Sequence, residues 1–261
     1  MITKMDVPMS IFHRTRTVLV YKPDDYYENK KRYPVVYFQD GQNAFFDYSS
    51  YIGKSWGLLH YAQHYQWQVI IVAIYCNFEG FKRMDEYGPW PICEQYSQEE
   101  TGKEHYIIGG EGKDYVKWMI EELKPLIDRR FATLPDQSAI VGSSMGAIIS
   151  SYAALEFPEI FPKCASLSSA FWFYMDEFKS IIQSHTYSKD FSFYFDLGEF
   201  EGCGNAEFDQ RYIESNEEIY ALLKEKVTHL DYEFFEGASH NEMEWKKRVP
   251  LFMNFLFGED I

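Results

Sequence analysis

The chain has 261 residues, of which 46% are hydrophobic and 25% charged, and its formal net charge at pH 7 is −15. Such an acidic surface repels phosphate backbones and anionic lipids, so we expect neither nucleic acid nor a membrane as a partner. No apolar stretch approaches the length of about 18 residues that spans a bilayer, and residues 1–20 lack the features of a secretory signal. The composition predicts an ordinary globular protein with one domain over residues 1–261.

The cysteines are widely spaced and form no CxxC pair, and two of them fall in apolar runs that are typical of buried thiols. They are Cys76, Cys93, Cys164 and Cys203. We therefore expect reduced cysteines and a cytoplasmic location.

Short apolar runs rich in β-branched and aromatic residues alternate along the chain with longer helical patterns. The predicted strands are residues 16–21, 34–39, 68–75, 138–143, 163–169, 192–198 and 231–237. The predicted helices are residues 53–65, 113–131, 145–157, 176–185 and 216–229. Nearly all-apolar strands separated by amphipathic helices indicate a mostly parallel, doubly wound α/β sheet that is covered on both faces. Alternation in the first strand predicts that it belongs to an antiparallel N-terminal edge.

Two connections are longer than is usual in such a fold, residues 76–113 and residues 170–191. Both leave the carboxyl ends of predicted strands, which is where open α/β sheets bind their ligands. We expect a pocket at this edge. Aromatic side chains in these connections would form the rim of an open cleft: Trp90, Trp172, Phe173 and Tyr174.

A G-x-S-x-G pattern lies between the strand at residues 138–143 and the helix at residues 145–157. In this context the pattern predicts a nucleophile elbow, a tight turn whose flanking glycines avoid a clash with the strained central serine. The central residue is Ser144, and Ser143 occupies the variable position. The alternative is a turn of small residues that only lets the helix pack closely on the strand.

A serine nucleophile needs a base, and the base needs an acid to orient it. In a fold of this kind the acid and then the histidine follow the serine along the chain. The second strand after the elbow leads to three candidate acids: Asp196, Glu199 and Glu201. The third strand leads to His240, which precedes a further helical segment.

An oxyanion hole needs two backbone N–H groups that point at the developing negative charge. The amide of Met145 follows the nucleophile at a helix N-terminus. The turn Asp40-Gly41-Gln42 follows the first parallel strand, so the amide of Gln42 is the second candidate donor.

Three other patterns do not predict a cofactor or a metal. Residues 109–114, GGEGKD, follow no strand and lack the Ser or Thr of a phosphate loop. His60 and His64 have helical spacing, but no third ligand accompanies them. The segment HNEME lacks the second histidine of a zinc protease.

The chain resembles the branch of the α/β-hydrolases that includes esterase D, enterochelin esterases and feruloyl esterases. The resemblance covers about residues 14 to 257 and rests on five segments: YPVVYFQDGQNAFF, FKRMDEYGPW, GSSMGA, DLGEFEG and SHNEMEWKKRVPLFMNFLF. It implies that Ser144 is the nucleophile, His240 the base and the DGQ turn part of the oxyanion hole. It also favours Glu201 as the acid, with Asp196 as the alternative.

The same resemblance places Arg83 and Glu86-Tyr87 beside the active site. We therefore expect Arg83 and Tyr87, together with Trp172 from the aromatic rim, to bind substrate.

These patterns predict a serine esterase that hydrolyses carboxylic esters through an acyl-enzyme. Acyl transfer to an alcohol or sugar on the same residues is one alternative, and a non-catalytic binding protein of the same fold is another. The connection at residues 170–191 is too short for a lid domain, which disfavours a long-chain lipase. The expected substrate is a small-molecule ester with a short acyl, aromatic acyl or sugar group. The sequence predicts no particular ester and no oligomeric state.

Overall fold

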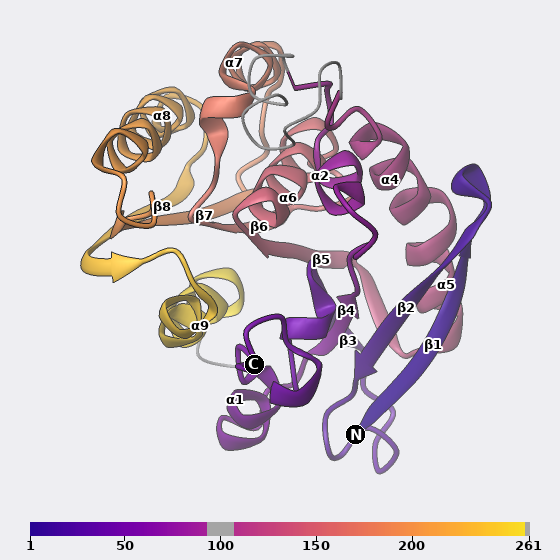
Figure 1. The fold of residues 1–261 in the computed structure, drawn as a ribbon. Helices are drawn as coiled ribbons and strands as arrows, with labels where there is room; N and C mark the ends of the chain where they lie inside the picture. The colour runs from indigo at the N-terminus through magenta and orange to yellow at the C-terminus, as the bar shows by residue number, and fades with distance from the viewer. Residues whose placement is uncertain (93–106, 259–261) are drawn as a thin grey trace.

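The computed structural model describes residues 1–92 and 107–258, and its centre is an eight-stranded sheet (Figure 1). The strand order across the sheet is β1-β2-β4-β3-β5-β6-β7-β8. Cys93 and much of the connection at residues 76–113 lie outside the described residues. The strands are β1 (Ile2–Met9), β2 (Arg14–Tyr21), β3 (Tyr33–Phe38), β4 (Ile70–Ile74), β5 (Thr133–Ser143), β6 (Lys163–Leu167), β7 (Ser192–Phe200) and β8 (His229–Ser239).

The direction of the strands matches the fold expected from the sequence. Neighbouring strands from β4 through β8 pair in parallel, whereas β1 pairs with β2, and β2 with β4, in antiparallel register. The antiparallel edge contains one strand that the sequence analysis missed. In β1 the buried residues Met5, Val7 and Met9 alternate with exposed ones, which is the pattern of a half-buried strand.

Helices cover both faces of the sheet (Figure 1). The helices α1 (Leu58–His64) and α9 (Glu242–Phe257) pack on one face. The other helices pack on the opposite face: α2 (Lys82–Tyr87), α4 (Gly112–Trp118), α5 (Lys124–Arg130), α6 (Met145–Glu156), α7 (Met175–Ser184) and α8 (Ala206–Lys224). A π-helical turn, η4 (Met119–Leu123), joins α4 to α5 within the helix predicted at residues 113–131.

Two helices differ from the sequence-based expectation. The sequence predicts a helix at residues 216–229, but α8 begins at Ala206, after Asn205 caps it by accepting bonds from two backbone amides. The short helix α2 lies inside the long connection that follows β4, where no helix was expected.

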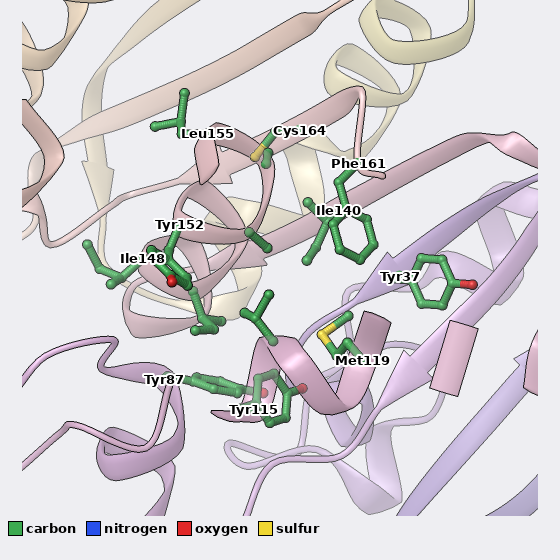
Figure 2. Close-up of a cluster of buried hydrophobic side chains, with 14 of the residues drawn as sticks. Tyr37, Tyr87, Tyr115, Met119, Ile140, Ile148, Tyr152, Leu155, Phe161 and Cys164 are labelled. Carbon is green, nitrogen blue, oxygen red and sulfur yellow. The ribbon is translucent and has the colours of Figure 1, made fainter. Parts of the chain in front are cut away.

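Figure 2 shows part of the core in which buried aromatic and aliphatic side chains join α2, α4 and α6 to the sheet. The rings of Tyr87 and Tyr115 pack edge to face at 5.6 Å, and those of Tyr37 and Phe161 do so at 5.8 Å. Close packing of this kind resists displacement of one element against another. The segments that follow β3, β4 and β5 are therefore held in fixed relative positions. Within the described residues, no helix is long and apolar enough to cross a membrane.

Candidate active site

Ser144 stands at the turn between β5 and α6 in a strained backbone conformation, with φ 56° and ψ −123°. A Cβ at Gly142 would collide with the carbonyl oxygen of Gly146, and a Cβ at Gly146 would lie 3.0 Å from Asp40 Oδ2. Close approach therefore requires glycine at position 142 and leaves little room for a larger residue at position 146, in agreement with the elbow pattern. Ser143, by contrast, is still part of β5 and is only 5% exposed.

Ser144 lines a cleft of about 450 Å³ at the carboxyl edge of the sheet. The other walls of the cleft come from the segments that follow β3, β4 and β8. They include Gln42, Arg83 and His240, three residues that the sequence analysis singled out. The pocket thus lies at the sheet edge where the sequence analysis expected one.

The carboxylate of Glu201 holds the ring of His240. Glu201 follows β7 and is 2% exposed, and its Oε2 lies 2.6 Å from His240 Nδ1. Its other oxygen, Oε1, accepts bonds from the Ser168 hydroxyl at 2.6 Å and from the Gly198 amide at 2.5 Å. An ionised carboxylate at Nδ1 favours the tautomer that carries its proton there, which leaves the lone pair on Nε2.

Ser168 binds the Glu201 oxygen that does not contact His240. No motif in the sequence pointed to Ser168. Its hydroxyl donates to Glu201 and accepts a bond from Trp245 Nε1 at 2.8 Å. The indole of Trp245 also packs edge to face against the His240 ring, with ring centroids 5.0 Å apart. These contacts fix both partners of the His240–Glu201 pair.

Asp196, the alternative acid, has different partners. It is fully buried in β7, accepts a bond from Arg248 Nη1 at 2.6 Å and accepts another from the Tyr194 hydroxyl at 3.1 Å. Burial raises the pKa of Asp196 to about 6, although the charge of Arg248 opposes the shift. Among the described residues the structure brings Glu201, and not Asp196, to His240.

Two backbone amides are available as oxyanion donors. Neither the N–H of Gln42 nor that of Met145 has a hydrogen-bond acceptor in the part of the chain that the structure describes. Gly41 lets the turn approach β4, because a Cβ there would collide with the backbone of Ala73. The side-chain oxygen of Gln42 accepts the Cys76 amide at 3.2 Å and so ties the turn to the next segment.

Arg83 projects from α2 into the cleft and forms an ion pair with Asp40. Its Nε and Nη2 donate to the two carboxylate oxygens of Asp40, both at 2.7 Å. The side chain is 31% exposed, so part of the guanidinium remains open to the cleft. Because Asp40 begins the turn that carries Gln42, this pair also anchors the turn.

Tyr87 and Glu86, which the resemblance placed beside the active site, lie in the core behind it. Tyr87 lies among the buried core side chains of Figure 2 and is 0% exposed. Its hydroxyl accepts a hydrogen bond from the Asp40 amide at 3.0 Å. Glu86 is equally buried and accepts two bonds from Arg16. The expectation that Tyr87 contacts substrate is not supported by this position, because its neighbours already enclose it.

The aromatic residues expected at the rim do not line the described cleft. Tyr174 is buried, and the Trp90 ring packs against Tyr174, Tyr152 and Phe178. Trp172 likewise lies outside the cleft wall and packs against Phe173, Phe208 and Tyr212. Hydrophobic packing among these rings explains the difference, since an aromatic cluster buries more apolar surface than a solvent-exposed rim. Three other exposed apolar side chains line the cleft instead: Tyr51, Ile52 and Phe78.

Cys76 also lines the cleft, but its thiol is not an activated nucleophile. Burial and the nearby charge of Asp40 raise the pKa of Cys76 above its ordinary value, so the thiol stays protonated at neutral pH. Across residues 1–92 and 107–258, no group of three or more His, Cys, Asp or Glu side chains is arranged to hold a metal ion.

The parallel sheet, the strained serine turn after β5 and the histidine after β8 define the α/β-hydrolase fold. The family model Esterase, described as "Putative esterase", matches residues 10–252, and the chain belongs to this family. Family and fold together support an enzyme that hydrolyses esters.

Individual relatives are distant but cover most of the chain. The uncharacterized protein YbbA of Bacillus subtilis is 24% identical over 250 residues, which are 94% of this chain and 94% of that protein. The structure of an IroE-like serine hydrolase from Shewanella oneidensis superimposes with a TM-score of 0.74 at 16% identity, over 98% of this chain and 79% of that one. The BES protein from Bacillus cereus has the same TM-score at 17% identity, over 98% and 95%.

Proposed function

We propose that this chain is a serine esterase that hydrolyses carboxylic esters through an acyl-enzyme on Ser144. The observation that carries the proposal is the His240–Glu201 pair, with 2.6 Å between Nδ1 and Oε2, in the loops beside the strained Ser144. A carboxylate-bound histidine next to a serine on an elbow is the arrangement that activates a hydroxyl nucleophile. The description of the Shewanella structure as a serine hydrolase agrees with it.

In the proposed mechanism, Ser144 Oγ attacks the ester carbonyl while His240 Nε2 takes its proton. Glu201 stabilises the imidazolium that forms, and the amides of Gln42 and Met145 donate to the oxyanion. His240 then gives the proton to the leaving alkoxy oxygen, which departs as an alcohol. Water repeats the sequence on the acyl-enzyme: His240 takes its proton, the acid is released, and the proton returns to Ser144.

The cleft supports a small-molecule ester as substrate. Its volume of about 450 Å³ suits a short or aromatic acyl group, and exposed Tyr51, Ile52 and Phe78 offer apolar contacts near its mouth. The open part of the Arg83 guanidinium would donate to an oxygen of the substrate away from the reacting carbonyl. A panel of acetyl, butyryl, feruloyl and catecholate-lactone esters tests the substrate class.

We place this activity in the cytoplasm. The support is that Cys76, Cys164 and Cys203 are free thiols, which is the usual state in a reducing compartment. Cell fractionation with an antibody against the native chain tests the location, and recovery outside the cytoplasmic fraction would contradict it.

The decisive experiment for the catalytic role compares two neighbouring serines. Ser144→Ala should remove nearly all hydrolysis of p-nitrophenyl acetate and abolish labelling by a fluorophosphonate probe. Ser143→Ala is the matched control and should retain a substantial fraction of both, because the elbow exposes only the central serine. Labelling that survives in Ser144→Ala and disappears in Ser143→Ala would mean that the nucleophile is Ser143. A wild-type chain that neither hydrolyses the esters nor reacts with the probe would favour a binding protein.

A further inference from the structure

One acidic side chain in the wall of the cleft has no part in the proposed mechanism. Glu242 is the first residue of α9, closely follows His240 along the chain, and lines the cleft beside His240, Asn43 and Arg83. It is 7% exposed. A carboxylate in such a position loses most of its water, which costs free energy unless other groups replace those hydrogen bonds.

The protein itself supplies little of what the Glu242 carboxylate needs. Its Oε1 accepts a bond from Asn43 Nδ2 at 3.3 Å, which is a long contact with a neutral donor. Among residues 1–92 and 107–258, no other residue donates to this side chain, and no cation forms an ion pair with it. Its second oxygen, Oε2, is not closed off as a buried atom without a partner. Because Glu242 is otherwise buried and lines the cleft, we infer that Oε2 is accessible from the cleft.

The charges around the cleft favour a donor at this position. Asp40 and Arg83 neutralise each other through two short bonds, so Glu242 is the cleft carboxylate without a cation in the described part of the chain. Burial raises the pKa of Glu242 and the charge of Asp40 raises it further, whereas its own backbone amide and the charges of His240 and Arg83 oppose the shift. A ligand that brings a hydrogen-bond donor or a positive charge stabilises the ionised carboxylate, and an anionic group is repelled by it.

We propose that Glu242 Oε2 accepts a hydrogen bond from a hydroxyl or ammonium group of the substrate and thereby selects esters that carry such a donor. The inference rests on the proposed esterase function. A site built to bond a polar group of its substrate rejects an analogue that lacks the group, because the polar atom of the site then stays unpaired. Glu242 is thus a specificity-determining residue and takes no part in the proton transfers between Ser144 and His240.

The substitution that tests this role is Glu242→Gln. The amide oxygen of glutamine can still accept from Asn43, so the contact between α9 and the turn that carries Gln42 is kept. The negative charge and the second acceptor are lost. A residue that only held Asn43 in place would therefore tolerate the change with no altered choice of substrate.

The measurement is the preference for a donor-bearing ester over an apolar ester of the same size, taken as the ratio of their kcat/KM values. On the acyl side, p-nitrophenyl 3-hydroxypropanoate and p-nitrophenyl 3-aminopropanoate are each compared with p-nitrophenyl butanoate. On the alcohol side, 2-hydroxyethyl acetate is compared with propyl acetate. For at least one pair the preference should be about tenfold higher in wild type than in Glu242→Gln. The intrinsic reactivity of each ester cancels, because both proteins act on the same compounds.

The matched control is Glu244→Gln in the same helical turn, since Glu244 pairs with Lys247 and does not line the cleft. It should keep the wild-type preference. The pair that responds assigns the donor to the acyl or the alcohol part, and the two acyl esters separate a hydroxyl from an ammonium.

The inference is overturned if wild type shows no preference for a donor in any pair, if the preference survives in Glu242→Gln, or if Glu244→Gln loses it equally. The first of these outcomes needs only the wild-type chain and does not depend on how the variants fold. A wild-type chain that hydrolyses none of the esters and does not react with a fluorophosphonate would refute the proposed function itself. One that hydrolyses every ester without a preference refutes only the role of Glu242.

Discussion

Each of two buried carboxylates, Glu201 and Asp40, binds one side chain that lines the cleft. Glu201 follows β7 and binds the His240 imidazole, and Asp40 follows β3 and binds the Arg83 guanidinium. A histidine side chain can act as a general base and acid during a reaction, whereas an arginine side chain keeps its charge. A buried carboxylate thus holds the proposed general base at one position and a fixed positive charge at the other.

The partners of the two carboxylates differ in a way that fits these roles. The other bonds to Glu201 come from neutral donors, Ser168 and the Gly198 amide, so its negative charge remains available to stabilise an imidazolium. The two short bonds to Asp40 both come from Arg83, and its charge is thereby neutralised. We infer that Glu201 acts during turnover and that Asp40 mainly fixes the turn that carries Gln42.

Glu201→Gln should lower turnover more than any other substitution that tests the different roles of Glu201 and Asp40. The amide preserves the shape of the side chain but loses the charge that orients His240 and stabilises its protonated form. Turnover of p-nitrophenyl acetate should fall by roughly 10²- to 10⁴-fold, while the melting temperature changes little. Steady-state kinetics and a thermal melt of the purified variant provide the measurement.

Asp196→Asn is the control for that substitution, because Asp196 lies in β7, five residues before Glu201, but contacts Arg248 and not His240. Its turnover should stay within about threefold of wild type. A silent Glu201→Gln beside a damaging Asp196→Asn would assign the acid to Asp196. Mild effects of both would indicate a Ser–His dyad.

Arg83→Ala tests the Asp40–Arg83 pair and should lower activity less than Glu201→Gln does. Loss of the ion pair leaves the buried Asp40 carboxylate without its partner and loosens the Asp40-Gly41-Gln42 turn, whose Gln42 amide is a proposed oxyanion donor. We therefore expect kcat/KM for p-nitrophenyl acetate to fall by about tenfold. A preferred bulky ester should lose a further factor of about ten, since it also loses a donor in the cleft. Equal losses on both esters would refute the substrate contact, and no loss on either would refute both roles.

The smallest predicted effect is a pH dependence of stability at Asp196. Its pKa is about 6 in the folded chain and 3.8 ordinarily, so the folded state binds this proton more tightly than the unfolded state. The contribution of Asp196 to the free energy of unfolding is therefore complete below about pH 4 and is lost as the pH rises through about 6. Urea unfolding of wild type and Asp196→Asn across this range should show wild type losing stability relative to the variant. A relative gain would mean that the pairing with Arg248 outweighs burial.

Chain order and periodicity were enough to predict the parallel sheet, the elbow at Ser144 and the positions of His240 and Gln42 at strand ends. They could not choose between Asp196 and Glu201, because one lies in β7 and the other directly after it, and only the three-dimensional path of the chain decides which one meets His240. No motif in the sequence pointed to Ser168. Ser168 lies 33 residues from Glu201 and 77 from Trp245 along the chain, and only tertiary packing brings them together.

The sequence analysis was least accurate for aromatic residues that it expected beside the cleft, because burial decides where their rings lie. The family resemblance placed Tyr87 beside the active site, and the aromatic loop placed Trp90 at the rim. In the structure Tyr87 is buried, and the partly buried Trp90 packs on three aromatic rings outside the cleft wall. The sequence of the loop is rich in aromatic residues in either case, and composition does not say which rings pack on one another.

The central claim is that an acyl group resides on Ser144 during turnover. The most direct test mixes the wild-type chain with p-nitrophenyl acetate, quenches the reaction in acid within the first turnovers, and locates the acetyl group by peptide mass spectrometry. The account predicts one acetyl group on Ser144 that disappears as the substrate is exhausted. Acetylation of another residue, or hydrolysis with no acylated intermediate in a chain that turns over, would contradict it.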